Sequence, residues 1–314
     1  MSAATLDAEG RIAGRARAKT KAWRDDEEVF ETIVRVAHKA VARAEIDAKQ
    51  IAALGIGAPG PLDWETGYII EAVNLRFTNF PLGPRLAELF ECPVIVDNDV
   101  NAGTYGEFKA GAARGADFVL GVFVGTGIGG GIILNGALQH GFSRNAGEIG
   151  HTVIRAGGPR CGCGNRGCLE ALASRTAMAR DIRKAINRGH KTVMAEMLEK
   201  RSGNISSSAI KQAYDADDKV VKKIVRRAAR HIGIGIGNAA NLLGPQIVVL
   251  GGGVIEAMGE SFIDRIARSA RKTAFDMVAK EMKIVGSELG DDAGVIGAAM
   301  LAREALDRRI NVHQ

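Results

Sequence analysis

The sequence has no apolar run that approaches the roughly 18 residues a helix needs to cross a bilayer. Its first residues, MSAATLDAEGRIAGRARAKTKAW, also lack the continuous apolar core of a secretion signal. Both absences argue against a membrane span and against export. We therefore expect a soluble, cytoplasmic protein without a membrane partner.

A DNA-binding segment is also missing, because no helix-turn-helix pattern precedes the glycine-rich motifs. The net charge of +6 and the pI of about 9.2 nevertheless raise the question of nucleic acid. The basic residues are spread along the chain and interleaved with acids. The densest cluster, Lys222, Lys223, Arg226, Arg227 and Arg230, has helical spacing and is typical of a solvated helix face. We predict no nucleic-acid partner.

Glycine, by contrast, is abundant: the chain has 40, about twice the usual share. Many glycines lie in clusters between apolar strands, where the backbone turns sharply or approaches a ligand. Short apolar strands alternate with longer helices, which predicts an α/β fold, and the length allows two domains. Strands are expected at 51–57, 93–97, 118–124, 131–134 and 245–250, and helices at 27–46, 82–90, 101–112 and 294–308. Residues 231–237 alternate like a strand, and their pattern leaves strand and helix open.

Three of the four cysteines lie within eight residues, in Cys161-Gly-Cys163-Gly-Asn-Arg-Gly-Cys168, and His151 precedes them. Three thiolates and one imidazole on a glycine-rich loop suit tetrahedral Zn²⁺. The alternative is a disulfide or free thiols, but a disulfide is disfavoured in a reducing cytoplasm. Four protein ligands leave no open position, so we predict a structural zinc that holds residues 148–170 in place. The remaining cysteine, Cys92, is expected in the core.

The stretch that begins Gly125-Thr126-Gly127 formally contains GxGxxG, but a dinucleotide site needs a helix after the glycines, and a strand-like run follows here. Strand, glycine turn and strand suit an actin-like phosphotransferase that holds phosphate with backbone N–H groups and a threonine hydroxyl. An ordinary glycine hairpin is the alternative. A second cluster, 251–253, links a buried strand to a helix N-terminus, which attracts anions. The chain lacks GxxxxGK[ST], which excludes a P-loop enzyme.

Candidate acid–base residues follow a buried strand in Asp97-Asn98-Asp99-Val-Asn101. Sites in α/β proteins collect at such strand ends. A carboxylate there can accept the proton of an attacking hydroxyl, and an amide can fix a sugar by paired hydrogen bonds. Capping of the following helix is the alternative use of one of these side chains.

More carboxylates accompany the cysteine loop, since Glu148 lies three residues before His151 and Glu170 lies two residues after Cys168. Carboxylate oxygens accept hydrogen bonds from hydroxyl groups, so this loop suits a polyol. The alternative is a pair of surface acids near a zinc knuckle.

Five motifs occur together in one order and span nearly the whole chain. Together they resemble the ROK family, whose cysteine motif is highly specific. The family has a two-domain actin-like (ribonuclease H-like) fold and includes ATP-dependent glucokinases, other hexose or acylamino-sugar kinases, and transcriptional repressors with an added N-terminal winged helix. The motifs are Leu54-Gly-Ile-Gly-Ala-Pro-Gly-Pro, Asp97-Asn-Asp-Val-Asn101, Gly125-Thr-Gly-Ile-Gly-Gly, Gly147-Glu-Ile-Gly-His151 and Cys161-Gly-Cys-Gly-x-x-Gly-Cys-Leu-Glu170.

The resemblance implies a role for each matching residue. Asp99 corresponds to the catalytic base, and His151 would bind zinc through one ring nitrogen and a sugar hydroxyl through the other. The sugar contacts would be Gly60, Asn98, Asp99, Glu148, His151 and Glu170. The nucleotide contacts would be Gly125, Thr126, Gly127, Gly251, Gly252 and Gly253, and the zinc ligands His151, Cys161, Cys163 and Cys168.

The resemblance also implies the wider organisation. A small α/β domain would cover residues 1–112, completed by the C-terminal helix at 293–314, and a large domain with the zinc loop would cover 113–292. The ligands would be a hexose, with glucose first, together with ATP and Mg²⁺, and the protein would form a homodimer or homotetramer. The reaction would place the γ-phosphoryl group of ATP on the 6-hydroxyl of the hexose.

One family feature is missing from the sequence as given. Family members normally begin with a strand ending in Asp-x-Gly-Gly-Thr, whereas this sequence opens near Thr5-Leu-Asp-Ala-Glu-Gly-Arg-Ile12, which resembles the hairpin after that strand. We expect either that the true start lies upstream, or that the chain is a sugar-binding relic with impaired transfer. A non-catalytic sugar-binding regulator is therefore the alternative function.

Overall fold

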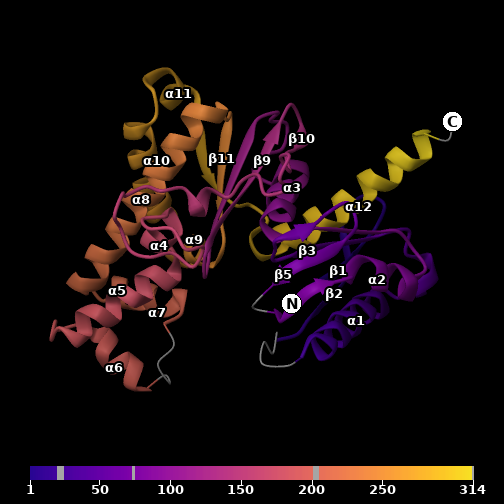
Figure 1. The fold of residues 1–314 in the computed structure, drawn as a ribbon, viewed down its shortest axis with the longest axis horizontal. Helices are drawn as coiled ribbons and strands as arrows, with labels where there is room; N and C mark the ends of the chain where they lie inside the picture. The colour runs from indigo at the N-terminus through magenta and orange to yellow at the C-terminus, as the bar shows by residue number, and fades with distance from the viewer. Residues whose placement is uncertain (20–24, 73–74, 201–204, 313–314) are drawn as a thin grey trace. The chain divides into compact units, whose positions relative to one another are not determined.

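The structure is a computed structural model that describes residues 1–314 except 20–24, 73–74, 201–204 and 313–314. It contains two compact units, each of which is described by itself (Figure 1). The predicted domain boundaries at 112 and 293 stay predictions. Unit 1 comprises Met1–Gly115, Leu138–Ala146 and Asp291–Gln314, and unit 2 comprises Ala116–Ala137 and Gly147–Gly290.

Unit 1 is a mixed α/β structure whose strands form three small sheets. β1 pairs antiparallel with β2, β3 pairs parallel with β7, and β4, β5 and β6 form an antiparallel sheet. The strands are β1 Ser2–Leu6, β2 Ile12–Arg17, β3 Leu54–Ala58, β4 Leu62–Asp63, β5 Tyr68–Ala72, β6 Phe77–Phe80 and β7 Val94–Asn98. The helices are α1 Asp26–Arg43, a short 3-10 turn at Ala48–Gln50, α2 Leu82–Phe90, α3 Asp99–Ala110 and α12 Ala293–Val312.

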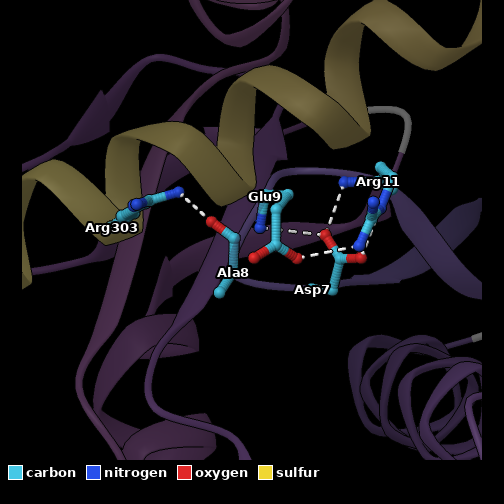
Figure 2. A network of polar contacts seen from close by, with 5 residues as sticks. All are labelled: Asp7, Ala8, Glu9, Arg11 and Arg303. Atoms are coloured by element: carbon cyan, nitrogen blue, oxygen red, sulfur yellow. Dashed lines mark hydrogen bonds and ion pairs between the residues drawn. The ribbon is translucent and has the colours of Figure 1, made fainter.

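The hairpin expected near the start of the chain is present as β1 and β2. Asp7 closes its turn by accepting hydrogen bonds from the N–H groups of Glu9 (3.0 Å) and Arg11 (2.8 Å). The Arg11 N–H and guanidinium lower the pKa of the Asp7 carboxyl. Arg303 of α12 donates to the carbonyl of Ala8 at 2.6 Å, so the last helix is fastened to the first turn (Figure 2).

The last helix, α12 (yellow in Figure 1), packs on α3 and β3 of unit 1. Two glycines make this close approach possible. A Cβ at Gly297 would lie 1.7 Å from the Ala102 carbonyl oxygen, and a Cβ at Gly106 would lie 2.3 Å from that of Ala293. Cys92 is buried in the core of unit 1, which includes Leu86 and Phe90 of α2, as the sequence predicted.

Unit 2 is built on one five-stranded sheet with the order β10-β9-β8-β11-β12. β8 is antiparallel to β9 and parallel to β11, which is parallel to β12. The strands are β8 Val119–Val124, β9 Ile128–Leu134, β10 Ala137–Leu138, β11 Ile247–Gly251 and β12 Lys283–Gly286. The helices are α4 Leu169–Ala173, α5 Arg175–Asn187, α6 Val193–Lys200, α7 Ser207–Asp215, α8 Lys219–Leu243, α9 Gly253–Met258, α10 Glu260–Thr273 and α11 Asp276–Glu281, with a 3-10 turn at Ile149–His151.

The ambiguous stretch 231–237 is helical and lies in the middle of α8. Glycine and isoleucine alternate here because the helix packs against neighbouring helices on more than one side. A Cβ at Gly233 would lie 2.5 Å from the Ile266 carbonyl oxygen of α10, whereas a Cβ at Gly235 would lie 2.7 Å from the side chain of Leu169 in α4. Glycine is therefore needed where α8 approaches both neighbours.

Several expected boundaries differ from the structure by one to four residues. The strand expected from residue 51 begins at Leu54, and the strand expected from Gly131 begins at Ile128 and includes the glycines. The helix expected to begin at Asn101 begins at Asp99, because the Asn98 side chain caps it earlier. Within the described residues, no helix combines the length and apolar character that a membrane span requires.

Candidate functional site

The predicted site residues fall into two groups, one in each unit. Unit 1 holds Gly60, Asn98 and Asp99 at one sheet edge. β3 and β7 run parallel, with Ala58 opposite Asn98, so the turn at Gly60 and the start of α3 leave from the same edge. A Cβ at Gly57 would lie 3.2 Å from the Asp99 Cα, so β3 and the start of α3 are in close contact.

Hydrogen bonding separates the roles of the polar residues at this edge. Asp97 is buried and accepts from the Asn98 N–H (2.7 Å) and the Asn101 side-chain amide (2.9 Å), and its other oxygen lies 2.7 Å from His140 Nε2. Asn98 is the N-cap of α3, since its side-chain oxygen accepts from the N–H groups of Val100 and Asn101. The capping alternative therefore applies to Asn98, and Asp97 is held inside the fold.

The Asp99 carboxylate takes no part in the hydrogen bonds of Asp97 and Asn98. It accepts only a short-range hydrogen bond from the Val100 N–H, at 2.9 Å, among the contacts between described residues. Desolvation raises the pKa of its carboxyl, and the Val100 N–H opposes the rise. The side chain is nevertheless accessible to solvent. Water reaches the carboxylate, but protein surrounds it on most other sides, so its charged form is less well solvated than in water.

His140 is a residue of this edge that the sequence did not indicate. It belongs to the segment Leu138–Ala146, stacks on Trp64 with ring centroids 4.4 Å apart, and contacts the buried Asp97 carboxylate. Nearby, Arg144 pairs with Asp63 and with Glu65. No local pattern marks His140, because its partners are distant in sequence.

In unit 2 the two glycine clusters lie side by side. β8 and β11 are parallel, with Gly251 opposite Phe123, so the turns that follow them leave from the same edge. Gly252 has a φ of +87°, and a Cβ there would lie 2.8 Å from the Val124 carbonyl oxygen. A strand, β9, and not a helix follows Gly125–Gly127, so the dinucleotide interpretation of GxGxxG does not apply.

Glu170 lies against the first glycine turn. Its Oε2 accepts a hydrogen bond from the Ile128 N–H at 3.0 Å, and its Oε1 lies 4.0 Å from the Cys161 sulfur. A Cβ at Gly127 would lie 2.2 Å from Glu170 Oε2, whereas one at Gly125 would meet nothing within 4 Å. Glycine at 127 is therefore required by the carboxylate itself.

Arg175 is a second residue that sequence reasoning missed. It is the first residue of α5, and its guanidinium donates to the Thr126 hydroxyl at 2.5 Å. Its backbone N–H donates to the Gly125 carbonyl at 3.0 Å, so the glycine turn is attached to the start of α5. The local sequence signal is Ser174, an N-cap residue directly before Arg175, which indicates a basic residue at the start of a helix.

The predicted metal ligands form a compact cluster. The ligand atoms of His151, Cys161, Cys163 and Cys168 all lie within 4.8 Å of one another. The Cys163 and Cys168 sulfurs are 3.7 Å apart, and His151 Nδ1 lies 3.6 Å from the Cys161 sulfur. A zinc tetrahedron with bonds of about 2.3 Å to sulfur and 2.0–2.1 Å to nitrogen has edges of about 3.8 and 3.6 Å. These two edges of the cluster therefore match those of a tetrahedral zinc site, and its other ligand atoms lie within 4.8 Å of one another.

The environment of the cluster opposes ionisation of two thiols. Burial raises the pKa of Cys161 and raises the pKa of Cys168 to about 12. Cys163 is exposed, and the Asn165 N–H lowers the pKa of its thiol. All are free thiols. A bound cation is the partner that would favour thiolates here.

His151 joins this cluster to the carboxylates. Its Nδ1 faces Cys161, and its Nε2 lies 3.9 Å from Glu148 Oε2. The 3-10 turn Ile149–His151 places these two side chains on one side. One ring nitrogen is thus available to the metal cluster and the other to a polar ligand beside Glu148.

The chain is similar to a known protein family and to several characterised proteins. The model of the ROK family matches residues 1–305. A glucokinase of Halalkalibacterium halodurans is 40% identical over 252 residues, covering 80% of this chain and 76% of that protein. A xylose repressor of Caldicellulosiruptor bescii is 32% identical over 292 residues, covering 92% of this chain and 72% of that protein.

A solved structure gives the same result for the fold. A ROK family glucokinase from Streptomyces griseus, in complex with glucose and AMPPNP, matches with a TM-score of 0.82 and 32% identity, covering 96% of this chain and 95% of that chain. The predicted two-domain actin-like α/β fold is therefore confirmed. The family match over nearly the whole length also confirms the resemblance drawn from the motifs, and the chain belongs to the ROK family.

Proposed function

We propose that this protein is a sugar kinase that transfers the γ-phosphoryl group of ATP to a hexose, glucose first, at its 6-hydroxyl. The hydroxyl oxygen forms a bond to the γ-phosphorus, the bond to the β-phosphate oxygen breaks, and ADP leaves. Asp99 takes the hydroxyl proton. Positioning and charge neutralisation, with Mg²⁺ on the nucleotide, supply most of the acceleration in such transfers.

The position of Glu170 is the observation that carries the proposal. A carboxylate suited to sugar hydroxyls accepts from Ile128 beside the glycine turn, and the same side chain borders the cysteine cluster. Polyol recognition and phosphate binding are therefore adjacent within unit 2. Arg175 adds a cation at the Thr126 hydroxyl, where it would neutralise phosphate charge.

The other site residues take their roles from their surroundings. Asp99 has a carboxylate free of the network that holds Asp97, which suits a general base. Asn98 uses its oxygen for capping and keeps its amide N–H groups for a sugar hydroxyl. In the proposal Gly60 lines the sugar site through its backbone, and the remaining contacts to sugar and nucleotide are those that the family motifs imply.

Zinc fits the cysteine cluster by its dimensions and donor set, and it would be held by His151, Cys161, Cys163 and Cys168. With four protein ligands the zinc would be structural, and it would hold the loop so that Glu148 and Glu170 face the bound sugar. His151 would offer Nε2 to a sugar hydroxyl while Nδ1 serves the metal, so the metal also orients a recognition group.

A sugar-binding regulator is the second candidate, favoured by the 32% identity with a xylose repressor. A coupled assay for ADP formation over a panel of hexoses and acylamino-hexoses separates the two. The kinase forms ADP with glucose above all, whereas a regulator binds a sugar in calorimetry and forms no sugar-dependent ADP. Sugar binding without turnover would overturn the proposed activity.

We expect one zinc per chain. Elemental analysis should find it in wild type and in Cys92→Ser, whose cysteine lies in the core of unit 1, but not in Cys163→Ser. The loss follows because removal of one thiolate ligand weakens zinc binding, so that the chelator wash removes the metal. Chelator-washed wild type that is folded but holds clearly less than one zinc would rule out this prediction.

Asp99→Asn should lower kcat by roughly 10²–10⁴ and leave the sugar dissociation constant within a few-fold, because the base acts on the proton in transit. In wild type, kcat/KM should fall as pH falls through the Asp99 pKa, since the base must be ionised. That fall should lie above the ordinary value of 3.8, because desolvation raises this pKa. Asp97→Asn serves as the contrast and should lower thermal stability instead. An Asp99→Asn protein with most of its turnover would mean that the base lies elsewhere.

Gly127→Ala and Gly125→Ala form a matched pair. Alanine at 127 must displace Glu170, because its Cβ would lie 2.2 Å from Oε2, whereas alanine at 125 meets open space. Calorimetry without nucleotide should show glucose binding weakened about tenfold or more in Gly127→Ala, the scale of one lost charge-assisted hydrogen bond. Gly125→Ala should bind like wild type. Equal affinities in both variants would disprove a link between Glu170 and the sugar.

A further inference from the structure

Unit 2 carries two neighbouring cavities away from the glycine turns, of about 440 and 450 Å³. They share Lys219 and Lys223 at the start of α8, and the 440 Å³ cavity is also lined by the C-terminal half of α5. α5 and α8 pack against each other along this surface (Figure 1). The sequence indicated only a solvated basic face on α8, and it gave no reason for α5 to contribute basic residues to the same cavity.

The residues that line the two cavities carry a large excess of positive charge. Seven Lys and Arg side chains line the two cavities against two aspartates, a formal charge of +5, while the whole chain carries +6. Both aspartates are already paired, Asp181 with Arg227 and Asp217 with Lys222. A third acid, Asp218, is buried at the helix start, where it accepts hydrogen bonds from the α8 backbone. The basic side chains besides Arg227 are Lys184, Arg188, Lys219, Lys222, Lys223 and Arg226.

The arrangement is unfavourable without an anion. Lys219 and Lys223 are four residues apart on α8, as are Lys222 and Arg226, and like charges at this spacing destabilise a helix. Lys184 and Arg188 repeat the spacing at the end of α5. Among the described residues, only Lys222 and Arg227 of the seven basic side chains form an ion pair with a carboxylate. The other five are Lys184, Arg188, Lys219, Lys223 and Arg226.

The lining defines the class of ligand. Lysine and arginine are the side chains that bind phosphate groups, as point charges and as bidentate donors. From Lys219 to Arg226 the helix rises about 10 Å, which is more than one phosphate spans. Among the described residues that line the cavities there is no Phe, Tyr or Trp on which a base could stack. These features fit a compact polyphosphate anion better than a nucleic acid.

We propose that this basic double cavity binds a small anion with two or more phosphate groups, at a site distinct from the glycine turns. Such a ligand could be inorganic polyphosphate or a bisphosphorylated sugar, which share closely spaced phosphates. The site does not depend on the proposed kinase activity. Its occupation can therefore be tested whether or not the protein turns over a sugar.

Lysine footprinting tests the site directly. The protein is acetylated briefly with and without inorganic tripolyphosphate, and modification of each lysine is read by mass spectrometry. Tripolyphosphate should slow acetylation of Lys184, Lys219 and Lys223 by about fivefold or more, and high salt should reduce this protection, as for any charge-driven contact. Lys39 and Lys49, exposed lysines of unit 1, should be unaffected. A bisphosphorylated sugar in a parallel arm distinguishes the two sources.

Paired variants complete the test. Lys219→Gln/Lys223→Gln should abolish protection of Lys184, whereas Lys39→Gln/Lys49→Gln should preserve it. The proposal is overturned if Lys184 stays protected in the first variant, if no lysine of the cavity is protected in wild type, or if Lys39 and Lys49 are protected equally. It also fails if orthophosphate protects as well as tripolyphosphate, or if single-stranded DNA protects at lower phosphate concentration.

Discussion

The hydrogen bond from the Ile128 N–H to Glu170 is the contact on which the arrangement of unit 2 depends. It ties α4, which follows the cysteine cluster, to the turn between β8 and β9. Gly127 must stay without a side chain for this contact to exist, and Glu170 keeps its second oxygen near Cys161. The Glu170 carboxylate therefore links the cysteine cluster to the glycine turn between β8 and β9.

Chemistry with a clear local pattern could be predicted from the sequence. The cysteine spacing foretold a cluster whose edges match a zinc tetrahedron, and the strand after GxGxxG separated a phosphate turn from a dinucleotide site. The five strands and four helices that were placed individually begin and end within four residues of the observed bounds. The sequence did not decide whether the centre of α8 is a helix or a strand, because a helix buried on several sides shows no single apolar face. Its glycines are explained only by the close approach of α10 and α4.

Contacts between residues far apart in the chain could not be predicted from the sequence. His140 meets Asp97 across 43 positions and Arg175 meets Thr126 across 49, so neither has a spacing that could be recognised. The roles within Asp97-Asn98-Asp99 also needed the structure, since three adjacent polar residues look equivalent in a sequence. Their hydrogen bonds distinguish a buried carboxylate, a helix cap and a free carboxylate.

Under the proposed function, zinc bound at the cysteine cluster would position Glu148 and Glu170 to bind the sugar. The most direct measurement is the glucose dissociation constant of Cys163→Ser by calorimetry, beside wild type and Cys92→Ser at the same temperature. We expect an affinity lower by about tenfold or more for Cys163→Ser alone, the scale on which groups next to a metal site act. A folded Cys163→Ser protein that has lost its metal and binds glucose as tightly as wild type would contradict this expectation.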